Sequence, residues 1–212
     1  MDKAERIRNE KLGAGLIKAL SLRHFDAYYC ASASEAAEKI LSLIPKTDVV
    51  SWGGSMTMEA LGVIDRVKKG GWRVIDRSTA QSQEEKIEIM RRALLCDTYL
   101  TGANAISEDG EIVNVDGNGN RVAAMTFGPK SVIVACGMNK VVKTAQDAVS
   151  RARNTAAPVN AQRFDIRTPC KTTGTCADCK STDSICSYIV RTRLCKPAGR
   201  IKVVLVGEAL GF

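Results

Sequence analysis

Short apolar runs alternate with longer amphipathic stretches along residues 1–100, and this alternation most strongly limits the folds open to the chain. Strands that alternate with helices through short connections favour a parallel sheet with helices packed on its faces. The sequence therefore predicts an α/β protein with a mostly parallel sheet flanked by helices. The predicted strands are residues 25–30, 48–52, 72–76, 98–100, 131–136 and 200–207, and the predicted helices are 34–41, 55–70, 82–96 and 141–156.

A glycine- and asparagine-rich segment, Asp116 to Asn120, interrupts this alternation. Dipeptides such as Asn118-Gly119 are favoured in the tight turns that join antiparallel strands. The segments 111–115 and 121–127 on either side are therefore predicted to form a β-hairpin.

The cysteine-rich segment, residues 165–197, lies between the helix predicted at 141–156 and the final strand. Because that strand is predicted to return to the main sheet, the segment is an excursion from the sheet and not a free tail. We therefore expect a single domain over residues 1–212, with an N-terminal helix over 1–22.

The composition is that of an ordinary globular protein, with 45% hydrophobic and 25% charged residues. No uninterrupted apolar stretch has the length of a membrane-spanning helix, and the charged, amphipathic N-terminal residues do not resemble a signal peptide. We expect a cytoplasmic protein with no membrane partner. Thiols are kept reduced in the cytoplasm, so clustered cysteines there favour metal or redox chemistry over structural disulfides.

Positive charge is concentrated near the cysteines. The formal net charge is +8, and residues 160–212 hold nine Lys and Arg against four Asp and Glu. Such a basic segment could contact nucleic acid, but no binding motif and no interleaving of aromatic with basic residues accompanies it. We favour compensation of negative charge on metal-bound thiolates, and nucleic acid is not an expected partner.

The segment Ser51 to Thr57, SWGGSMT, places two glycines between a predicted strand and a predicted helix. Backbone N–H groups at such a junction can bind an anion, and glycine lets a phosphate or carboxylate approach closely. This position lies at the carboxyl end of a parallel strand, where ligands usually bind in such sheets. The alternative is an ordinary turn in which Ser55 or Thr57 caps the helix. The predicted ligand-binding residues are Gly53, Gly54, Ser55 and Thr57.

The segment 101–121 is rich in carboxylates and carboxamides and also follows a predicted strand. Its side chains could face a cleft beside the glycine loop, where Glu108 or Asp109 would serve as a nucleophile or a general base. The alternative is turn chemistry, since Asp109-Gly110 is a favoured turn dipeptide. The further ligand-binding residues predicted here are Asn104, Asn114 and Asp116.

Five of the eight cysteines lie between residues 170 and 195. Cys176 and Cys179 form a C-x2-C pair, a spacing that lets two thiolates bind one metal ion from a tight turn. Cys170 and Cys186 would complete a four-thiolate set for zinc or an iron–sulfur cluster, with Cys195 as a reserve ligand. The second pair of a zinc ribbon and the ferredoxin pattern are not found in the sequence, so redox-active or disulfide-forming thiols and inert reduced cysteines stay open as alternatives. The remaining cysteines are expected in the core: Cys30, Cys96 and Cys136.

Several long stretches resemble one family, the LUD domain family of lactate-utilisation proteins of the LutC type. The resemblance covers nearly the whole chain. It rests on SWGGSMT (51–57), TGANAISEDGEIVNVDGNGNRVAAMTFGP (101–129), NTAAPVNAQR (154–163), TPCKTTGTCADC (168–179) and IKVVLVGEALGF (201–212).

This resemblance implies a fold related to NagB, ribose-5-phosphate isomerase and CoA transferases. In that superfamily a glycine- and hydroxyl-rich loop after a strand binds phosphate or CoA-like ligands, and residues 53–57 match its place. CoA transferases carry a nucleophilic glutamate in a Ser-Glu-Asn-Gly-like loop. Ser107-Glu108-Asp109-Gly110 is similar over four residues and departs from it at Asp109.

The family is associated with oxidation of lactate to pyruvate beside iron–sulfur and flavin- or cluster-dependent subunits. We therefore expect a protein that binds a small anionic metabolite and supports oxidation of lactate or a similar 2-hydroxy acid, with redox partner subunits. The cofactor would be an iron–sulfur cluster or zinc, and no nucleotide cofactor is expected. A non-redox transferase or isomerase using Glu108 or Asp109 and a non-catalytic ligand-binding regulator are the alternatives, and a homodimer is an open alternative to a monomer.

Overall fold

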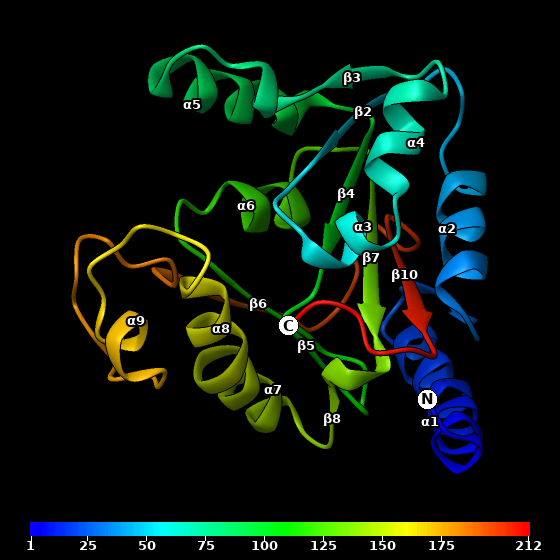
Figure 1. Ribbon diagram of the computed structural model, residues 1–212. Coiled ribbons are helices and arrows are strands. Elements are labelled where there is room, and N and C mark those ends of the chain that lie inside the picture. The colour runs from blue at the N-terminus through cyan, green and yellow to red at the C-terminus, as the bar shows by residue number, and fades with distance from the viewer.

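The computed structural model describes all residues, 1–212, and contains a six-stranded sheet in which every neighbouring pair is parallel (Figure 1). The strand order is β1-β10-β7-β4-β2-β3. The final strand pairs with both β1 and β7, so the chain returns to the main sheet after the cysteines, as predicted. The strands are β1 (Asp26–Cys30), β2 (Val49–Trp52), β3 (Arg73–Ile75), β4 (Thr98–Gly102), β7 (Ser131–Gly137) and β10 (Ile201–Val206).

Helices cover both faces of this sheet, which confirms the predicted α/β architecture. Successive residues of β7 alternate between two cores, with Val132 and Val134 in one and Ile133 and Ala135 in the other. The first core lies under α1 (Lys3–Leu22), α6 (Asn120–Thr126) and the turn that follows α5 (Gln83–Arg92), and the second lies under α2 (Ala33–Ser42), α3 (Met56–Ala60) and α4 (Val63–Lys69). None of the helices combines the length and the apolar character needed to cross a bilayer.

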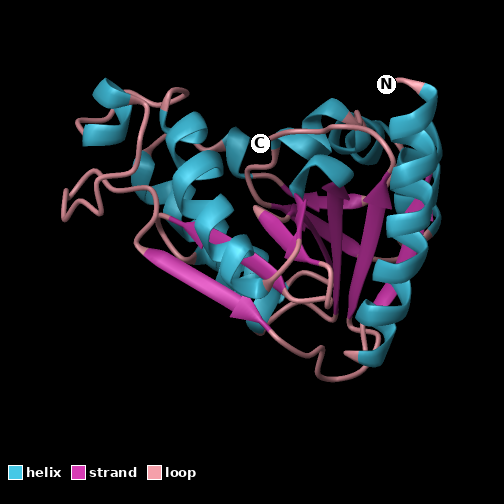
Figure 2. Ribbon diagram, turned by 90° about the horizontal axis from the view of Figure 1, so that it is seen from below, coloured by secondary structure: helices cyan, strands magenta, loops and turns pink.

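A second, four-stranded sheet lies beside the first, with the order β8-β5-β6-β9 (Figure 2). Small residues of a continuous helical segment pack on it, including Ala148 and Ala152 against Ala105 and Val113. This segment contains a π-helical turn at Ala152–Ala156. The strands are β5 (Ala105–Ser107), β6 (Ile112–Asp116), β8 (Val141–Val142) and β9 (Tyr188–Thr192), and the helices are α7 (Ala145–Arg151) and α8 (Ala157–Ala161). Short 3-10 turns occur at Arg77–Thr79, Ala93–Leu95 and Met138–Lys140.

The hairpin predicted between residues 111–115 and 121–127 is wrong, because β6 pairs instead with the strand before it, β5. β5 and β6 pair antiparallel around the turn that contains Gly110, whose φ is +90°. The strand predicted at residues 121–127 is not formed, because these residues belong almost entirely to helix α6. Asp116 fixes the start of this helix, since its carboxylate accepts hydrogen bonds from the backbone N–H groups of Arg121 (3.0 Å) and Val122 (3.1 Å).

The cysteine-rich segment contains the short helix α9 (Pro169–Thr173) and the strand β9. β9 pairs antiparallel with β6, so the excursion completes the second sheet, which the sequence did not predict. Glu111, at the start of β6, ties this strand to the rest of the protein. Its carboxylate binds the guanidinium of Arg191 on β9 and also that of Arg23 at the end of α1 (3.2 Å).

Candidate functional site

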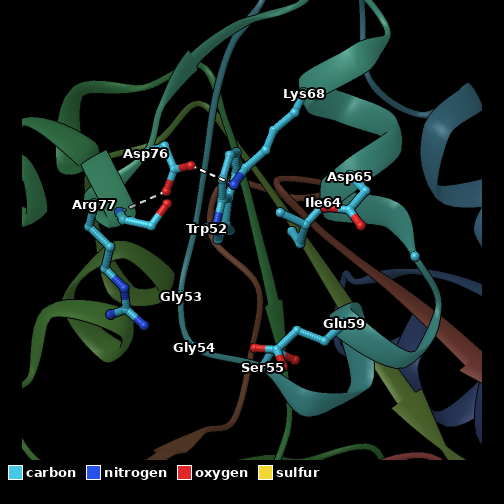
Figure 3. A pocket seen from close by; sticks show the side chains of 12 residues that line it. Trp52, Gly53, Gly54, Ser55, Glu59, Ile64, Asp65, Lys68, Asp76 and Arg77 are labelled. Carbon is cyan, nitrogen blue, oxygen red and sulfur yellow. Dashed lines mark hydrogen bonds and ion pairs between the residues drawn. The ribbon is translucent and has the colours of Figure 1, made fainter. Parts of the chain in front are cut away.

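The loop Gly53–Ser55 lies between the carboxyl end of β2 and the start of α3 (Figure 3). Two arginine side chains flank it closely. A Cβ on Gly53 would lie 2.9 Å from Cδ of Arg121, and a Cβ on Gly54 would lie 2.8 Å from Nη2 of Arg77. Ser55 also caps α3 by accepting a hydrogen bond from the Met58 N–H at 3.3 Å. The loop therefore caps the start of α3 and lies between two cationic side chains.

A cavity of about 330 Å³ opens on one side of this loop (Figure 3). Trp52 forms part of its wall, and Lys68 reaches across it to an ion pair with Asp76 at 2.6 Å. Two more carboxylates, Glu59 and Asp65, also line it. Its charges are mixed, so this cavity does not by itself select an anion.

A second, smaller cavity of about 60 Å³ lies on the other side of the loop. Gly54 and Ser55 line both cavities, so one ligand bound over the loop could reach both. The charged side chains that line the second cavity are all cationic: Arg121, Lys140 and Arg163.

Lys140 is the most unusual of these residues, because its side chain is buried and no carboxylate neutralises it. The residue is 3% exposed, and its ammonium donates hydrogen bonds to Oγ1 of Thr57 (2.8 Å) and to the carbonyl of Ala103 (3.3 Å). Burial lowers the pKa of Lys140 to about 8, and the neighbouring Arg151 and Arg121 also lower it. A buried ammonium without a counter-ion is costly, so an anion bound here would be strongly favoured.

Arg121 forms the other wall of this smaller cavity. Its guanidinium donates to the Gly102 carbonyl (3.2 Å), to Oδ1 of Asn104 (3.2 Å) and to the Val115 carbonyl. Burial lowers its pKa, which the neighbouring Asp116 carboxylate partly offsets. Arg121 therefore presents a fixed positive charge at the carboxyl edge of the main sheet.

The predicted ligand-binding residues divide into two groups. Gly53, Gly54, Ser55, Thr57 and Asn104 line one or both of the cavities beside the loop. Asn114 and Asp116 line neither. Asn114 is buried and donates to the Gly102 carbonyl at 3.0 Å, with no partner for its own oxygen, while Asp116 caps α6 and so orients Arg121.

The structure does not bring Glu108 and Asp109 to the loop. Both lie in the turn between β5 and β6, and neither lines a cavity beside residues 53–57. The Glu108 carboxylate pairs with Lys143 at 2.6 Å. Asp109 pairs with Arg23 at 2.7 Å and accepts a hydrogen bond from Ser107, and that hydrogen bond is the main cause of its lowered pKa. Asp109-Gly110 therefore forms a turn, the alternative to a catalytic role for this segment.

Four of the cysteines line one cavity of about 310 Å³: Cys170, Cys176, Cys179 and Cys186. All four are partly exposed and unpaired. Arg153 of the π-helical turn lies at this cavity, with its guanidinium 4.0 Å from the Cys176 sulfur and 2.5 Å from the Asp178 carboxylate. Lys180 also lines it.

The four thiols that line this cavity, beside two cations, are of the donor type that zinc and iron–sulfur clusters take. The arrangement is open, however, because no three His, Cys, Asp or Glu side chains are grouped closely enough to hold a metal ion together. The arrangement therefore does not support the predicted metal site.

Cys195 does not join this set. It is 2% exposed within the first core, where its sulfur accepts the Ile201 N–H and contacts the Pro197 carbonyl, each at 3.2 Å. The predicted core cysteines, Cys30, Cys96 and Cys136, are buried as expected. Burial raises the pKa of the Cys96 thiol to about 12, which suits an inert core residue.

Sequence reasoning missed the cations of the loop site. Arg121 lies in a segment whose sequence predicts a hairpin strand, and Lys140 follows a buried strand without any motif around it. The one available signal was position, because Lys140 comes three residues after the carboxyl end of β7, next to β4 in the sheet.

Fold and site together define a parallel-sheet α/β protein with a cationic pocket at the carboxyl edge of its sheet. The chain belongs to the LUD domain family, whose model matches residues 14–206. A comparison with curated proteins gives no match.

Solved structures resemble this fold at low sequence identity. A DUF162 family protein from Deinococcus radiodurans has a TM-score of 0.52 and 16% identity, over 95% of this chain and 97% of that one. Translation initiation factor eIF-2B from Pyrococcus horikoshii OT3 has a TM-score of 0.37 and 18% identity, over 55% and 50% of the two chains. Ribose 5-phosphate isomerase A from Neisseria gonorrhoeae has a TM-score of 0.35 and 16% identity, over 52% of each chain. The full-length likeness to the DUF162 protein concerns the fold alone.

Proposed function

We propose that this protein binds a small anionic metabolite, carrying a carboxylate or a phosphate, over the loop of residues 53–57. The observation that carries the proposal is the buried ammonium of Lys140, held by Thr57 and Ala103 with no carboxylate partner. An anion at this point would supply the missing counter-charge and accept charge-assisted hydrogen bonds. Arg121 lies on the same cavity and adds a second positive charge.

In this proposal the charged end of the ligand occupies the smaller cavity between Lys140 and Arg121. The remainder of the ligand extends past Gly54 and Ser55, which line both cavities, into the larger one. The carboxylates there, Glu59 and Asp65, are suitable acceptors for ligand hydroxyl groups.

The family resemblance links this anion to lactate or a similar 2-hydroxy acid, and the proposal includes support of its oxidation together with redox partner subunits in the cytoplasm. It assigns no catalytic role to Glu108 or Asp109, because both are engaged in ion pairs away from the loop.

Calorimetric titration with L-lactate, pyruvate and inorganic phosphate tests the binding proposal and separates carboxylate from phosphate ligands. Lys140→Met should weaken the best of these ligands by at least about tenfold, because a charge-assisted hydrogen bond contributes about 1.5–3 kcal/mol. Lys143→Met is the matched control, since this lysine is 78% exposed and pairs with Glu108. The proposal is wrong if the native protein binds none of the three anions, or if Lys140→Met binds them as well as the control does.

The second part of the proposal is a zinc ion or an iron–sulfur cluster held by Cys170, Cys176, Cys179 and Cys186. It is supported by the four thiols that line one cavity and by the cations Arg153 and Lys180 beside it. A cluster would supply an electron-transfer centre, whereas zinc would brace the segment. Because the thiols are spread in this structure, the segment would have to rearrange to bind a metal.

Iron and zinc analysis of anaerobically purified protein, with its absorption spectrum, tests this second part. We expect about one zinc ion or one cluster per chain, reduced by Cys176→Ala and unchanged by Cys30→Ala, a buried control outside the cavity. Colourless native protein without iron or zinc would exclude the site.

A further inference from the structure

A large groove with an apolar lining lies between α5 and α6, away from both proposed sites. Its volume is about 690 Å³, larger than either cavity beside the loop. One stripe of α5 forms one wall, α6 and the preceding turn form the other, and Tyr188 of β9 closes one end. The apolar lining residues are Ile87, Met90, Leu94, Val122, Ala123 and Tyr188.

Two large apolar side chains project beside this groove. Leu95 and Phe127 are each 86% exposed, more than any other large hydrophobic residue of the protein. They are carried by segments that touch, because Gly128 lies against the backbone of Leu94, with an added Cβ only 2.6 Å from that carbonyl. A projecting apolar pair beside an apolar groove marks an interaction surface.

This surface carries both a projecting apolar pair and an apolar groove. In a dimer with two-fold symmetry the same patch meets itself, so each feature of one copy contacts a different feature of the other. The projecting pair of one copy can therefore enter the groove of the second copy, and the reverse contact forms at the same time.

The charges of α5 are self-complementary. Its first turn carries Glu84 and Glu85, and its last turn carries Arg91 and Arg92. When two copies of this helix cross antiparallel, the acidic half of one faces the basic half of the other. Arg92 has no ion-pair partner within its own chain, whereas Arg91 already pairs with Glu88 at 3.3 Å.

We infer that the α5–α6 face is a homodimer interface, in which two antiparallel α5 helices pair and Phe127 and Leu95 of each copy pack into the groove of the other. A second copy of this chain is the occupant that this charge complementarity favours, since its own α5 carries both halves.

Sedimentation velocity over a series of protein concentrations tests this inference. We expect a reversible dimer, weakened at least about tenfold in its dissociation constant by Phe127→Ser or Leu95→Ser, as for central apolar residues of an interface. Both side chains are almost fully exposed, so neither change should disturb the fold, and circular dichroism checks this. Leu22→Ser is the matched control, because Leu22 is 80% exposed on α1 and outside this face.

A charge exchange tests the antiparallel pairing separately. Arg92→Glu alone should weaken the dimer, and the double change Glu84→Arg with Arg92→Glu should restore it, because both signs are exchanged on both copies. The inference fails if the native protein stays monomeric up to about 100 μM, a range in which interfaces of ordinary size associate. It also fails if a dimer forms that none of these changes weakens more than Leu22→Ser does.

Discussion

The ammonium of Lys140 donates a hydrogen bond of 2.8 Å to the hydroxyl of Thr57, joining the end of β7 to the first turn of α3. Thr57 Oγ1 in turn lies 3.3 Å from the carbonyl of Leu210, so the last residues of the chain lie over the same point. A Cβ on Gly211 would be 3.1 Å from the Lys140 nitrogen. The lysine is therefore fixed from three segments and cannot turn toward solvent to hydrate its charge.

Anion binding should depend on pH through this lysine. Burial lowers the pKa of Lys140 from its usual 10.5 to about 8, so the ammonium is charged below about pH 8 and loses its proton above it. Affinity for a carboxylate or phosphate should fall by up to about tenfold per pH unit above this value. Calorimetric titration on both sides of pH 8 measures this, and a flat profile would contradict the role of Lys140.

The same lowered pKa makes the stability of the ligand-free protein rise with pH, whereas anion affinity falls with pH. The unfolded chain keeps the usual lysine pKa and therefore binds more protons than the folded protein between about pH 8 and 10.5. The cost of charging Lys140 is fully present below pH 8 and is lifted as the pH rises through that window. The ligand-free protein should gain stability from this group on the alkaline side, while ligand binding weakens.

Replacing Thr57 by valine should destabilise the protein while preserving the shape of the side chain. The change removes the hydroxyl partner of a buried ammonium and leaves Lys140 with the Ala103 carbonyl alone. We expect the free energy of unfolding to fall by about 1–3 kcal/mol, measured by urea denaturation at neutral pH. Thr79→Val is the matched control, since its hydroxyl also donates to a backbone carbonyl (2.8 Å) but lies at the surface. Equal effects of the two changes would contradict the importance of the buried contact.

The sequence predicted the main sheet well because each of its strands is a short apolar run beside a helix. It failed at residues 121–127, where two physical signals compete. Gly119 has a φ of +79°, which suits a hairpin turn and a helix start equally. The capping by Asp116 and the burial of Val122 and Met125 on one side of α6 decide for the helix, and neither can be read from the turn residues alone.

The sequence predicts the glycine loop of the candidate site but not the cationic side chains beside it. Gly53, Gly54 and Ser55 have a local signature, because a strand, two glycines and a helix cap follow one another in the chain. Lys140 and Arg121 are two of 31 basic residues, and only the arrangement of β7, β4 and β2 brings them to the loop. The four cysteines were found by spacing, whereas the burial of Cys195 depends on the final turn before β10.

The ion pairs of Glu111, which hold strand β9 to the rest of the protein, should be lost in acid. The Glu111 side chain is 3% exposed and binds Arg191 and Arg23, and the hydrogen bond from Arg191 is the main cause of its lowered pKa. A carboxylate with a lowered pKa contributes stability that is present above its usual value of 4.5 and is lost as the pH falls through the folded value.

Glu111→Gln should accordingly lower the free energy of unfolding by about 2–4 kcal/mol at neutral pH, because it removes two charge-assisted contacts. The loss should shrink as the pH falls below 4.5, where the unfolded carboxyl is protonated, and through the lower folded pKa, where the native carboxylate also becomes neutral. Glu10→Gln is the control, since this carboxylate is 50% exposed and pairs with Arg6 at 4.0 Å. A loss that is the same at neutral and acid pH would show that the ion pairs are not its cause.

A single methyl group on Gly53 should disturb anion binding by moving Arg121. Gly53 does not have a positive φ, so alanine is compatible with its backbone and the constraint is the approach of the arginine. The added Cβ would lie 2.9 Å from Cδ and 3.2 Å from Cγ of Arg121, below ordinary contact distance. Because the guanidinium is held by backbone carbonyls and Asn104, the side chain has to give up some of these bonds.

We expect Gly53→Ala to lower the affinity for the anion found by calorimetry by about threefold to thirtyfold, the range for losing one charge-assisted bond in part. Gly15→Ala, on an open face of α1 with nothing within 4 Å of its Cβ, should leave affinity unchanged, and equal affinities for the two variants would remove Arg121 from the binding site.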